Sequence, residues 1–163
     1  MNTLNIQPAD YAIATIDDEV RVDGLCRDLL LTFYAELQAD GGDPEVATEL
    51  ARSADYFIRD FVVGFRQWNL FDEKRSPVRP FAATWYIVNT LDPTSGELAK
   101  HLSGILAFYR FLARHDLISG TFLERIEAEC NDHPFYEKRI KSFWEITGDG
   151  YYEWERACPV RGA

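Results

Sequence analysis

The sequence predicts an all-α protein, folded as a single helical-bundle domain of six or seven helices. Apolar residues recur at steps of three and four along most of the chain, which is the period of a helix with one buried face. Capping residues, prolines and glycines divide this pattern into helix-length segments. No two segments read as pairing strands. The 163 residues, 47% of them hydrophobic and 14% aromatic, are enough to bury a core without metal or disulfide support.

The first predicted helix lies within residues 1–50. Asp17 or Asp18 can cap its start, because a carboxylate accepts the unpaired backbone N–H groups of a first turn. The apolar pattern continues to about Asp40. The two glycines at 41–42 then end the helix, since glycine readily adopts the left-handed conformation found past helix ends.

The second predicted helix runs from about Pro44 to Trp68. Asp43 precedes it as a cap, and proline in a first turn costs no helical hydrogen bond. Gly64 inside this helix predicts a close helix crossing or a bend. The predicted buried stripe consists of Leu50, Ala54, Phe57, Phe61, Phe65 and Trp68.

Residues 69–79 predict a loop, and Ser76-Pro77 predicts the start of a third helix that ends near Asp92-Pro93. Trp85–Val88 is aromatic and β-branched, a composition that is also typical of strands. We expect a helix there, because the chain offers no partner strand.

Residues 95–118 contain the central predicted helix. Thr94 stands three residues before Glu97, which is the spacing of a capping box. Three cations of this helix fall on one face, opposite the apolar one; they are Lys100, Arg110 and Arg114. The predicted buried stripe is Leu98, Leu102, Ile105, Tyr109 and Leu112, widened by Leu106, Phe108 and Phe111.

The C-terminal part, residues 120–163, predicts short helices and an aromatic tail. Ser119 or Thr121 can cap one helix, and Pro134 can open the next. The tail at 151–154 is too aromatic for a free end, so we expect it to dock on the body or on a partner chain. The predicted partner-binding residues are Tyr151, Tyr152 and Trp154.

Charge divides the chain into three parts. The net charge is −10, yet residues 51–119 carry 9 bases and 7 acids, whereas the parts before and after are acidic. The net charge disfavours nucleic acids and anionic membranes as partners. The sequence contains no apolar run near the ~20 residues that a membrane span requires. Three widely spaced cysteines and an acidic N-terminus favour a cytoplasmic protein with reduced thiols and no signal peptide.

No recognisable motif for catalysis, metal binding or cofactor binding is present, so the prediction leans toward a protein that is not an enzyme. The acidic run at 17–19 could hold a divalent ion, but capping explains it more simply. Glu127, Cys130 and His133 have only a loose likeness to a metal site. His101 and His115 fit polar positions beside the core better than catalysts. Arginines at 52, 59 and 66 are typical of a solvated face, with phosphate tracking as the alternative.

One segment carries a family likeness. Leu102–Leu112 has the pattern of a helix in the N-terminal core-binding (SAM-like) domain of tyrosine recombinases and phage integrases, and Pro93–Ser95 stands where that family opens this helix. The resemblance covers about residues 51–119, with residues 1–50 as an N-terminal helical extension. It implies a SAM-like four-helix core and contact with duplex DNA. The residues that would contact DNA are Lys74, Arg75, Arg79, Lys100, Arg110 and Arg114. The family's catalytic domain carries Arg, His-x-x-Arg and a tyrosine nucleophile, but only 44 residues follow Ser119 and none of the three histidines opens a His-x-x-Arg, so recombinase activity is not implied.

Three functions follow as hypotheses. The first is a non-enzymatic protein that binds another protein, or that forms a homodimer through its aromatic tail. The second is a DNA-binding module related to the integrase core-binding domain. The third is a helical small-molecule binder or enzyme, with a pocket between the second and central helices. No metal or cofactor is predicted for any of them.

Overall fold

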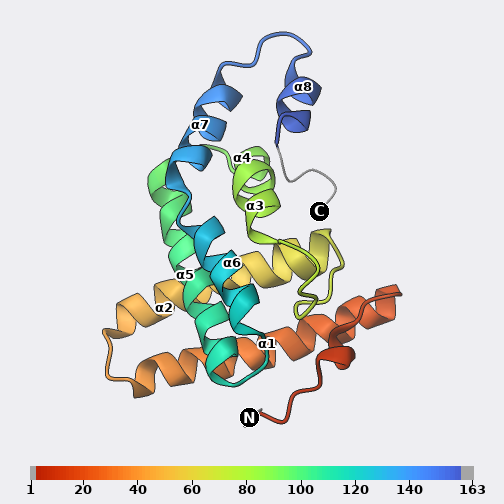
Figure 1. The fold of residues 1–163 in the computed structure, drawn as a ribbon, viewed down its shortest axis with the longest axis vertical. Helices are drawn as coiled ribbons and strands as arrows, with labels where there is room; N and C mark the ends of the chain where they lie inside the picture. The colour runs from red at the N-terminus through yellow and green to blue at the C-terminus, as the bar shows by residue number, and fades with distance from the viewer. Residues whose placement is uncertain (1–2, 159–163) are drawn as a thin grey trace.

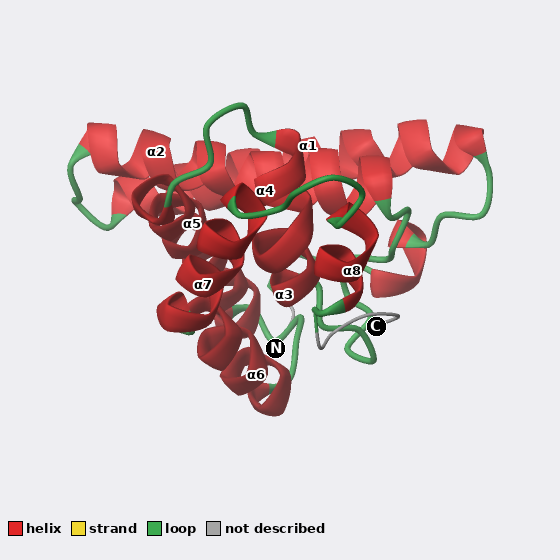
Figure 2. Ribbon diagram, turned by 90° about the horizontal axis from the view of Figure 1, so that it is seen from above, coloured by secondary structure: helices red, strands yellow, loops and turns green. Residues whose placement is uncertain are grey.

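The computed structural model describes residues 3–158, and within them it contains helices and loops but no β-strand (Figures 1 and 2). The predicted all-α, single-domain fold is therefore confirmed. Contiguous α and π segments join into seven helices in this part of the chain, preceded by a 3-10 turn, η1, at Pro8–Tyr11. Helices α1 (Ile16–Ala39) and α2 (Pro44–Asp55) lie side by side, and α5 (Ser95–Arg114) crosses α2 (Figure 1). Helices α6 (Gly120–Cys130) and α7 (His133–Trp144) pack against α5. No helix among the described residues is long and apolar enough to cross a bilayer.

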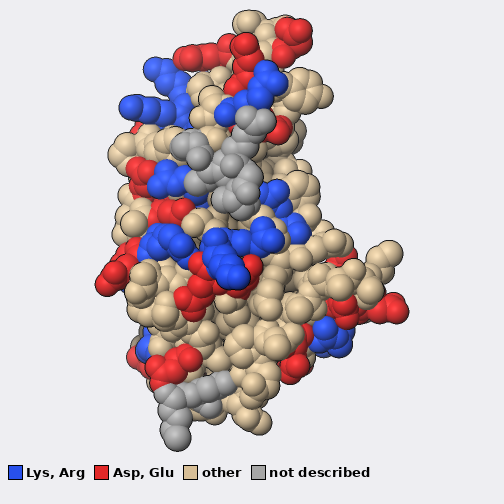
Figure 3. Space-filling model, turned by 45° about the vertical axis from the view of Figure 1, so that its right-hand side comes forward, with Lys and Arg blue, Asp and Glu red and all other residues tan. Residues whose placement is uncertain are grey.

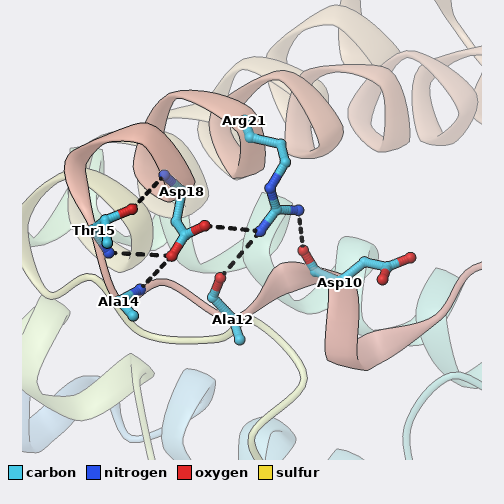
Figure 4. A network of polar contacts seen from close by, with 6 residues as sticks. All are labelled: Asp10, Ala12, Ala14, Thr15, Asp18 and Arg21. Atoms are coloured by element: carbon cyan, nitrogen blue, oxygen red, sulfur yellow. Dashed lines mark hydrogen bonds and ion pairs between the residues drawn. The ribbon is translucent and has the colours of Figure 1, made fainter.

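Helix α1, Ile16–Ala39, begins at a capping box that lies two residues before the predicted cap. Thr15 is the N-cap: its hydroxyl accepts the backbone N–H of Asp18, and the Asp18 carboxylate accepts the backbone N–H of Thr15 (Figure 4). Asp18 also accepts from the backbone of Ala14 and pairs with Arg21, which holds the η1 carbonyl of Asp10. Asp17 and Asp18 thus stand in the first turn and are not the cap.

Helix α2, Pro44–Asp55, continues without a break into a π-helical segment, η2, at Tyr56–Phe65. The backbone N–H of Arg66 bonds the carbonyl of Phe61, five residues back, at 2.9 Å. A π turn holds more residues than an α turn, so side chains four apart stay close to one line. Phe57, Phe61 and Phe65 accordingly stack, with successive ring centroids 6.0 and 6.1 Å apart. The helix ends three residues before the predicted Trp68.

Gly64 belongs to this π winding. A Cβ added there would lie 3.0 Å from the carbonyl oxygen of Arg59 in the same helix. No other helix approaches Gly64 that closely, so the crossing predicted for it lies elsewhere.

The third helix combines α3 (Val78–Pro80), the π segment η3 (Phe81–Trp85) and α4 (Tyr86–Asn89). Its helical state confirms the assignment of the β-branched aromatic stretch at 85–88. It ends at Asn89, three residues before the predicted Asp92. Phe81 anchors it, because the Phe81 ring meets the rings of Phe57 and Phe61 at 5.1 and 5.5 Å.

Helix α5, Ser95–Arg114, is the predicted central helix, and it ends four residues before 118. Thr94 caps it by accepting the backbone N–H of Glu97 at 3.1 Å. The reciprocal half of the predicted box is replaced, because the backbone N–H of Thr94 donates to the Tyr86 hydroxyl. The Glu97 carboxylate pairs with Lys100 instead.

The close helix crossing occurs where α5 passes α2. A Cβ added at Gly104 would lie 2.5 Å from the carbonyl oxygen of Leu50 and 2.6 Å from the Cβ of Ser53. Only glycine permits this approach of two helix backbones. The predicted apolar stripe of α5 is buried against it, as part of a core that extends from Tyr11 to Cys158.

Helices α6 (Gly120–Cys130), α7 (His133–Trp144) and α8 (Tyr151–Arg156) complete the described chain. Ser119 caps α6 by accepting the backbone N–H of Phe122. Pro134 occupies the first turn of α7, as predicted. Cys26, Cys130 and Cys158 are buried and form no disulfide.

The crossing at Gly104 gives a stability prediction. Gly104→Ala forces a methyl group into backbone and Cβ atoms that cannot yield locally, so we expect it to lower the free energy of unfolding by about 3 kcal/mol or more. Gly96→Ala is the matched control, because nothing lies within 4 Å of a Cβ at that position of the same helix. It should be neutral or add up to about 1 kcal/mol. Urea unfolding followed by circular dichroism measures both. Equal stabilities for the two variants would contradict the close crossing.

Candidate functional site

The basic side chains predicted to contact DNA do not form a free cationic face in the described structure. Lys74 is exposed in the loop before α3. The other five pair with acidic groups: Arg75 with Asp72 (3.3 Å), Arg79 with Asp132 (2.9 Å), Lys100 with Glu97 (3.3 Å), Arg114 with Glu36 (2.9 Å) and Arg110 with Glu127.

The acidic flanks supply three of these partners. Glu36 lies in α1, Glu127 in α6 and Asp132 just before α7. Figure 3 shows the result on one face, where acidic side chains lie among the basic ones. Duplex DNA is bound by cations that neutralise phosphates, and a cation already paired with a carboxylate contributes little. The pairing therefore weakens the case for DNA.

The acidic run at 17–19 forms the first turn of α1, where Asp18 completes the capping box of Thr15. The Asp18 carboxylate accepts hydrogen bonds from the backbone N–H groups of Ala14 and Thr15 and pairs with Arg21 (Figure 4). These hydrogen bonds lower the pKa of Asp18. Among residues 3–158, no cluster of three His, Cys, Asp or Glu side chains has the spacing of a metal site. Glu127 of the loose metal-like group pairs with Arg110, and burial raises the pKa of the Cys130 thiol to about 12.

The two histidines near the central helix contact aromatic and polar side chains of the fold. His101 lies between the rings of Tyr56 and Tyr86, at 5.2 and 5.5 Å, and burial lowers its pKa. His115 contacts the Glu36 carboxylate at 2.7 Å and the Thr3 hydroxyl at 2.6 Å. His115 thus lies between a carboxylate and a hydroxyl, whereas the ring contacts of His101 are with aromatic side chains.

The aromatic tail docks on the body through Trp154 of α8. Arg139 of α7 holds it, because the guanidinium lies 3.8 Å from the Trp154 ring centroid and donates to the Trp154 carbonyl at 2.7 Å. The same guanidinium donates to the carbonyl of Ala83 in η3 at 2.9 Å. Of the three predicted partner-binding residues, Trp154 is buried, Tyr151 is half-buried and Tyr152 is 68% exposed.

This docking closes one side of a pocket of about 420 Å³. The two π segments form its other walls, with Phe61 and Phe65 from η2 and Trp85 from η3. Val88 of α4 extends the wall. Across from them, α8 and the residues after it contribute Tyr151, Glu155 and Cys158. A pocket between helices was predicted, but with the second and central helices as its walls. Here the third helix and α8 take the place of the central helix.

Among residues 3–158, Arg66 is the one basic residue that lines this pocket. Its guanidinium lies 5.9 Å from the ring centroids of both Phe61 and Phe65, and 4.3 Å from that of Trp68. It forms no ion pair within the described chain, and its Nε is buried without an acceptor there. Burial and the nearby Arg75 lower the pKa of Arg66. The guanidinium remains charged at neutral pH.

The seven-residue spacing of Arg66 and two earlier arginines predicts a solvated face. That spacing gives no sign that Arg66 lines a pocket. The arginines of this group have different surroundings. Arg59 pairs with Asp55, four residues earlier, and with Asp23 of α1. Arg66 has no acidic residue three or four positions away on either side, and aromatic residues stand at 65 and 68. That local context is a signal that distinguishes Arg66 from Arg59.

Comparison with protein-family models, with curated proteins and with solved structures finds no match to this chain. Its function is therefore argued from the pocket and its surroundings.

The role of Arg139 gives the first prediction for this region. Arg139→Ala removes the hydrogen bonds from the guanidinium to the carbonyls of Ala83 and Trp154, and hydrogen bonds to a charged group contribute about 1.5–3 kcal/mol each. We expect α8 to detach, so that chymotrypsin cuts at its aromatic residues several-fold faster while the helical content of the rest is kept. Lys138→Ala, at the exposed neighbouring position, is the control. Unchanged digestion of the Arg139 variant would show that α8 is held by other contacts.

Glu129 of α6 gives a pH prediction. Burial raises the pKa of its carboxyl group, with Arg79 opposing this at 3.8 Å, and one carboxyl oxygen has no hydrogen-bond partner in the described chain. A raised folded-state pKa means that the protonated form favours folding, so stability is lost as the pH rises through that pKa. Glu129→Gln should therefore be more stable than the parent near pH 7.5, with the difference shrinking toward pH 4. Thermal unfolding at both pH values tests this. A difference that grows toward pH 4 would contradict it.

Proposed function

We propose that this protein works by binding another protein, and that an apolar side chain of the partner enters the pocket between η2, η3 and α8. The observation that carries this proposal is the exposed apolar rim of the pocket, formed by Phe65 and Val88. Phe65 and Val88 line the pocket and yet are 59% and 39% exposed, so the apolar surface continues out of the pocket onto the face around it. Interfaces of this kind place an aromatic or aliphatic anchor in a pocket, surrounded by flatter contacts.

The neighbourhood of the rim supports a macromolecular partner. Tyr152, 68% exposed, lies with its ring 5.6 Å from the ring of Tyr151 in the pocket wall. Tyrosine and phenylalanine are enriched where proteins meet, because they bury large areas at a low cost in side-chain entropy. The sequence-based expectation that the tail binds a partner is thereby narrowed to Tyr151 and Tyr152, since Trp154 is occupied by Arg139.

A small molecule is the second candidate, favoured by the volume of the pocket. About 420 Å³ falls within the range of about 300–1,000 Å³ for ligand sites. Such a ligand would be largely enclosed, however, and would leave the exposed rim at Phe65 unexplained.

Site-specific photo-crosslinking tests the proposal. Phe65 is replaced by p-benzoylphenylalanine in the full chain, and the protein is irradiated in an extract of its source cells. Leu91, 99% exposed and outside the pocket, carries the same group in the control. We expect a discrete crosslinked polypeptide from position 65 and none of the same mass from position 91.

The purified partner then gives the affinity readout. Phe65→Glu should weaken binding by at least about 10-fold, or about 1.4 kcal/mol, whereas Leu91→Glu should leave it unchanged. The same crosslinks from both positions, or an affinity that Phe65→Glu does not alter, would overturn the proposal. A crosslinked species of twice the chain's own mass would identify a second copy of this protein as the partner.

A further inference from the structure

Arg66 differs from Arg59, Arg75 and Arg79 of the middle segment in what surrounds it. Arg59, Arg75 and Arg79 each pair with an aspartate within 3.3 Å. Arg66 has aromatic rings in place of a carboxylate, and its Nε is buried with no acceptor among residues 3–158. A guanidinium without a carboxylate partner can pair with an acceptor that a ligand brings into the pocket.

The pocket restricts what this acceptor can be. Its walls are mainly aromatic and aliphatic, so the ligand must present an apolar group beside the charge. Glu155 on the α8 side adds a negative charge to the same pocket, and it therefore disfavours a doubly charged phosphate. A carboxylate has a single charge, and its two oxygens match the fork of donors on a guanidinium.

We propose that the pocket binds the C-terminal residue of a partner protein, with Arg66 pairing with the terminal carboxylate and the apolar side chain of that residue lying against the rings of Phe61 and Trp85. A polypeptide terminus places a carboxylate and a side chain on the same carbon, which matches a cation set directly beside an aromatic cavity. The inference rests on the proposed function and specifies which part of the partner enters the pocket.

The mouth of the pocket favours a peptide terminus over a free organic acid. Glu155 and Asn89 are exposed polar residues at the pocket, and their side-chain oxygens can accept peptide N–H groups. The exposed rim at Phe65 and Val88 then supports the residues that precede the terminal one. A free acid would use neither feature.

Fluorescence anisotropy with short Gly-Ser peptides tests this on the full chain. The peptides carry an N-terminal fluorophore and end in Leu, Phe, Trp or Asp, each as the free acid and as the amide. We expect the apolar acids to bind, the Asp-ended peptide to bind at least about 10-fold more weakly, and amidation to weaken the apolar peptides by at least about 10-fold.

Substitutions assign the effect to Arg66. Arg66→Gln should weaken the apolar acids by about 10-fold and bring acid and amide to similar affinities. Arg75→Gln is the matched control: Arg75 also lies over the Trp68 ring, at 4.8 Å, but it pairs with Asp72 and does not line the pocket. Its acid-to-amide ratio should stay within about 3-fold of the parent. Circular dichroism confirms that both variants are folded.

Three other results of the peptide-binding experiment would overturn the inference. Equal binding of acids and amides would overturn the carboxylate inference and leave the pocket as a site for an internal side chain of the partner. Competition by 3-phenylpropionate with the affinity of the best peptide would replace the peptide terminus by a small organic acid. No binding of any peptide at millimolar concentration would overturn the inference. The crosslink from position 65 judges the proposed function separately, because it requires no free carboxylate.

Discussion

The structure depends on the approach of α5 to α2 at Gly104. Because the two backbones nearly touch there, the apolar face of α5 lies directly against α2, and the following π segment η2 is fixed in direction. Helix α7 packs on both α5 and η3, so the position of α5 also determines the position of the third helix. The pocket lies between η2 and η3, so its width follows from a contact that contributes no atom to it. A glycine in the central helix thus sets the position of the candidate site.

Ion pairs explain why five of the six basic residues predicted to contact DNA form no free cationic face in the described part of the chain. Acidic residues from α1, α6 and the start of α7 lie over the basic face of the middle segment, and each neutralises a charge that is far from it in sequence. Exposed pairs of this kind contribute little stability individually. Their larger effect is on the electrostatic field, which loses the positive potential that would attract phosphate. The unevenness of charge along the sequence is cancelled by folding.

Periodicity and capping residues predicted which segments are helical, and the helix starts at Pro44 and Ser95 were correct. They could not predict the π winding at 56–65, because a stripe of phenylalanines at 57, 61 and 65 fits either winding, and they wrongly placed Phe65, which is 59% exposed, in the core. They also misplaced the close crossing: Gly64 and Gly104 look alike in sequence, and only the tertiary contacts distinguish them. The pocket was predicted between the wrong helices for the same reason. Its walls come from residues as far apart in sequence as Phe61 and Cys158, and their meeting depends on Arg139, whose bonds to η3 and α8 no local pattern indicates.

The partial burial of the Arg66 guanidinium costs free energy that other interactions must offset. Taking a guanidinium partly out of water is unfavourable, and this one has Arg75 nearby, which adds repulsion. Contacts with three aromatic rings return part of that cost, each worth about 0.5–2 kcal/mol according to how far the pair is desolvated. An apolar side chain at this position would pack among the same rings without any cost of desolvation. The charge is therefore poorly explained by folding alone, and it is better explained by a negatively charged group that enters the pocket from outside.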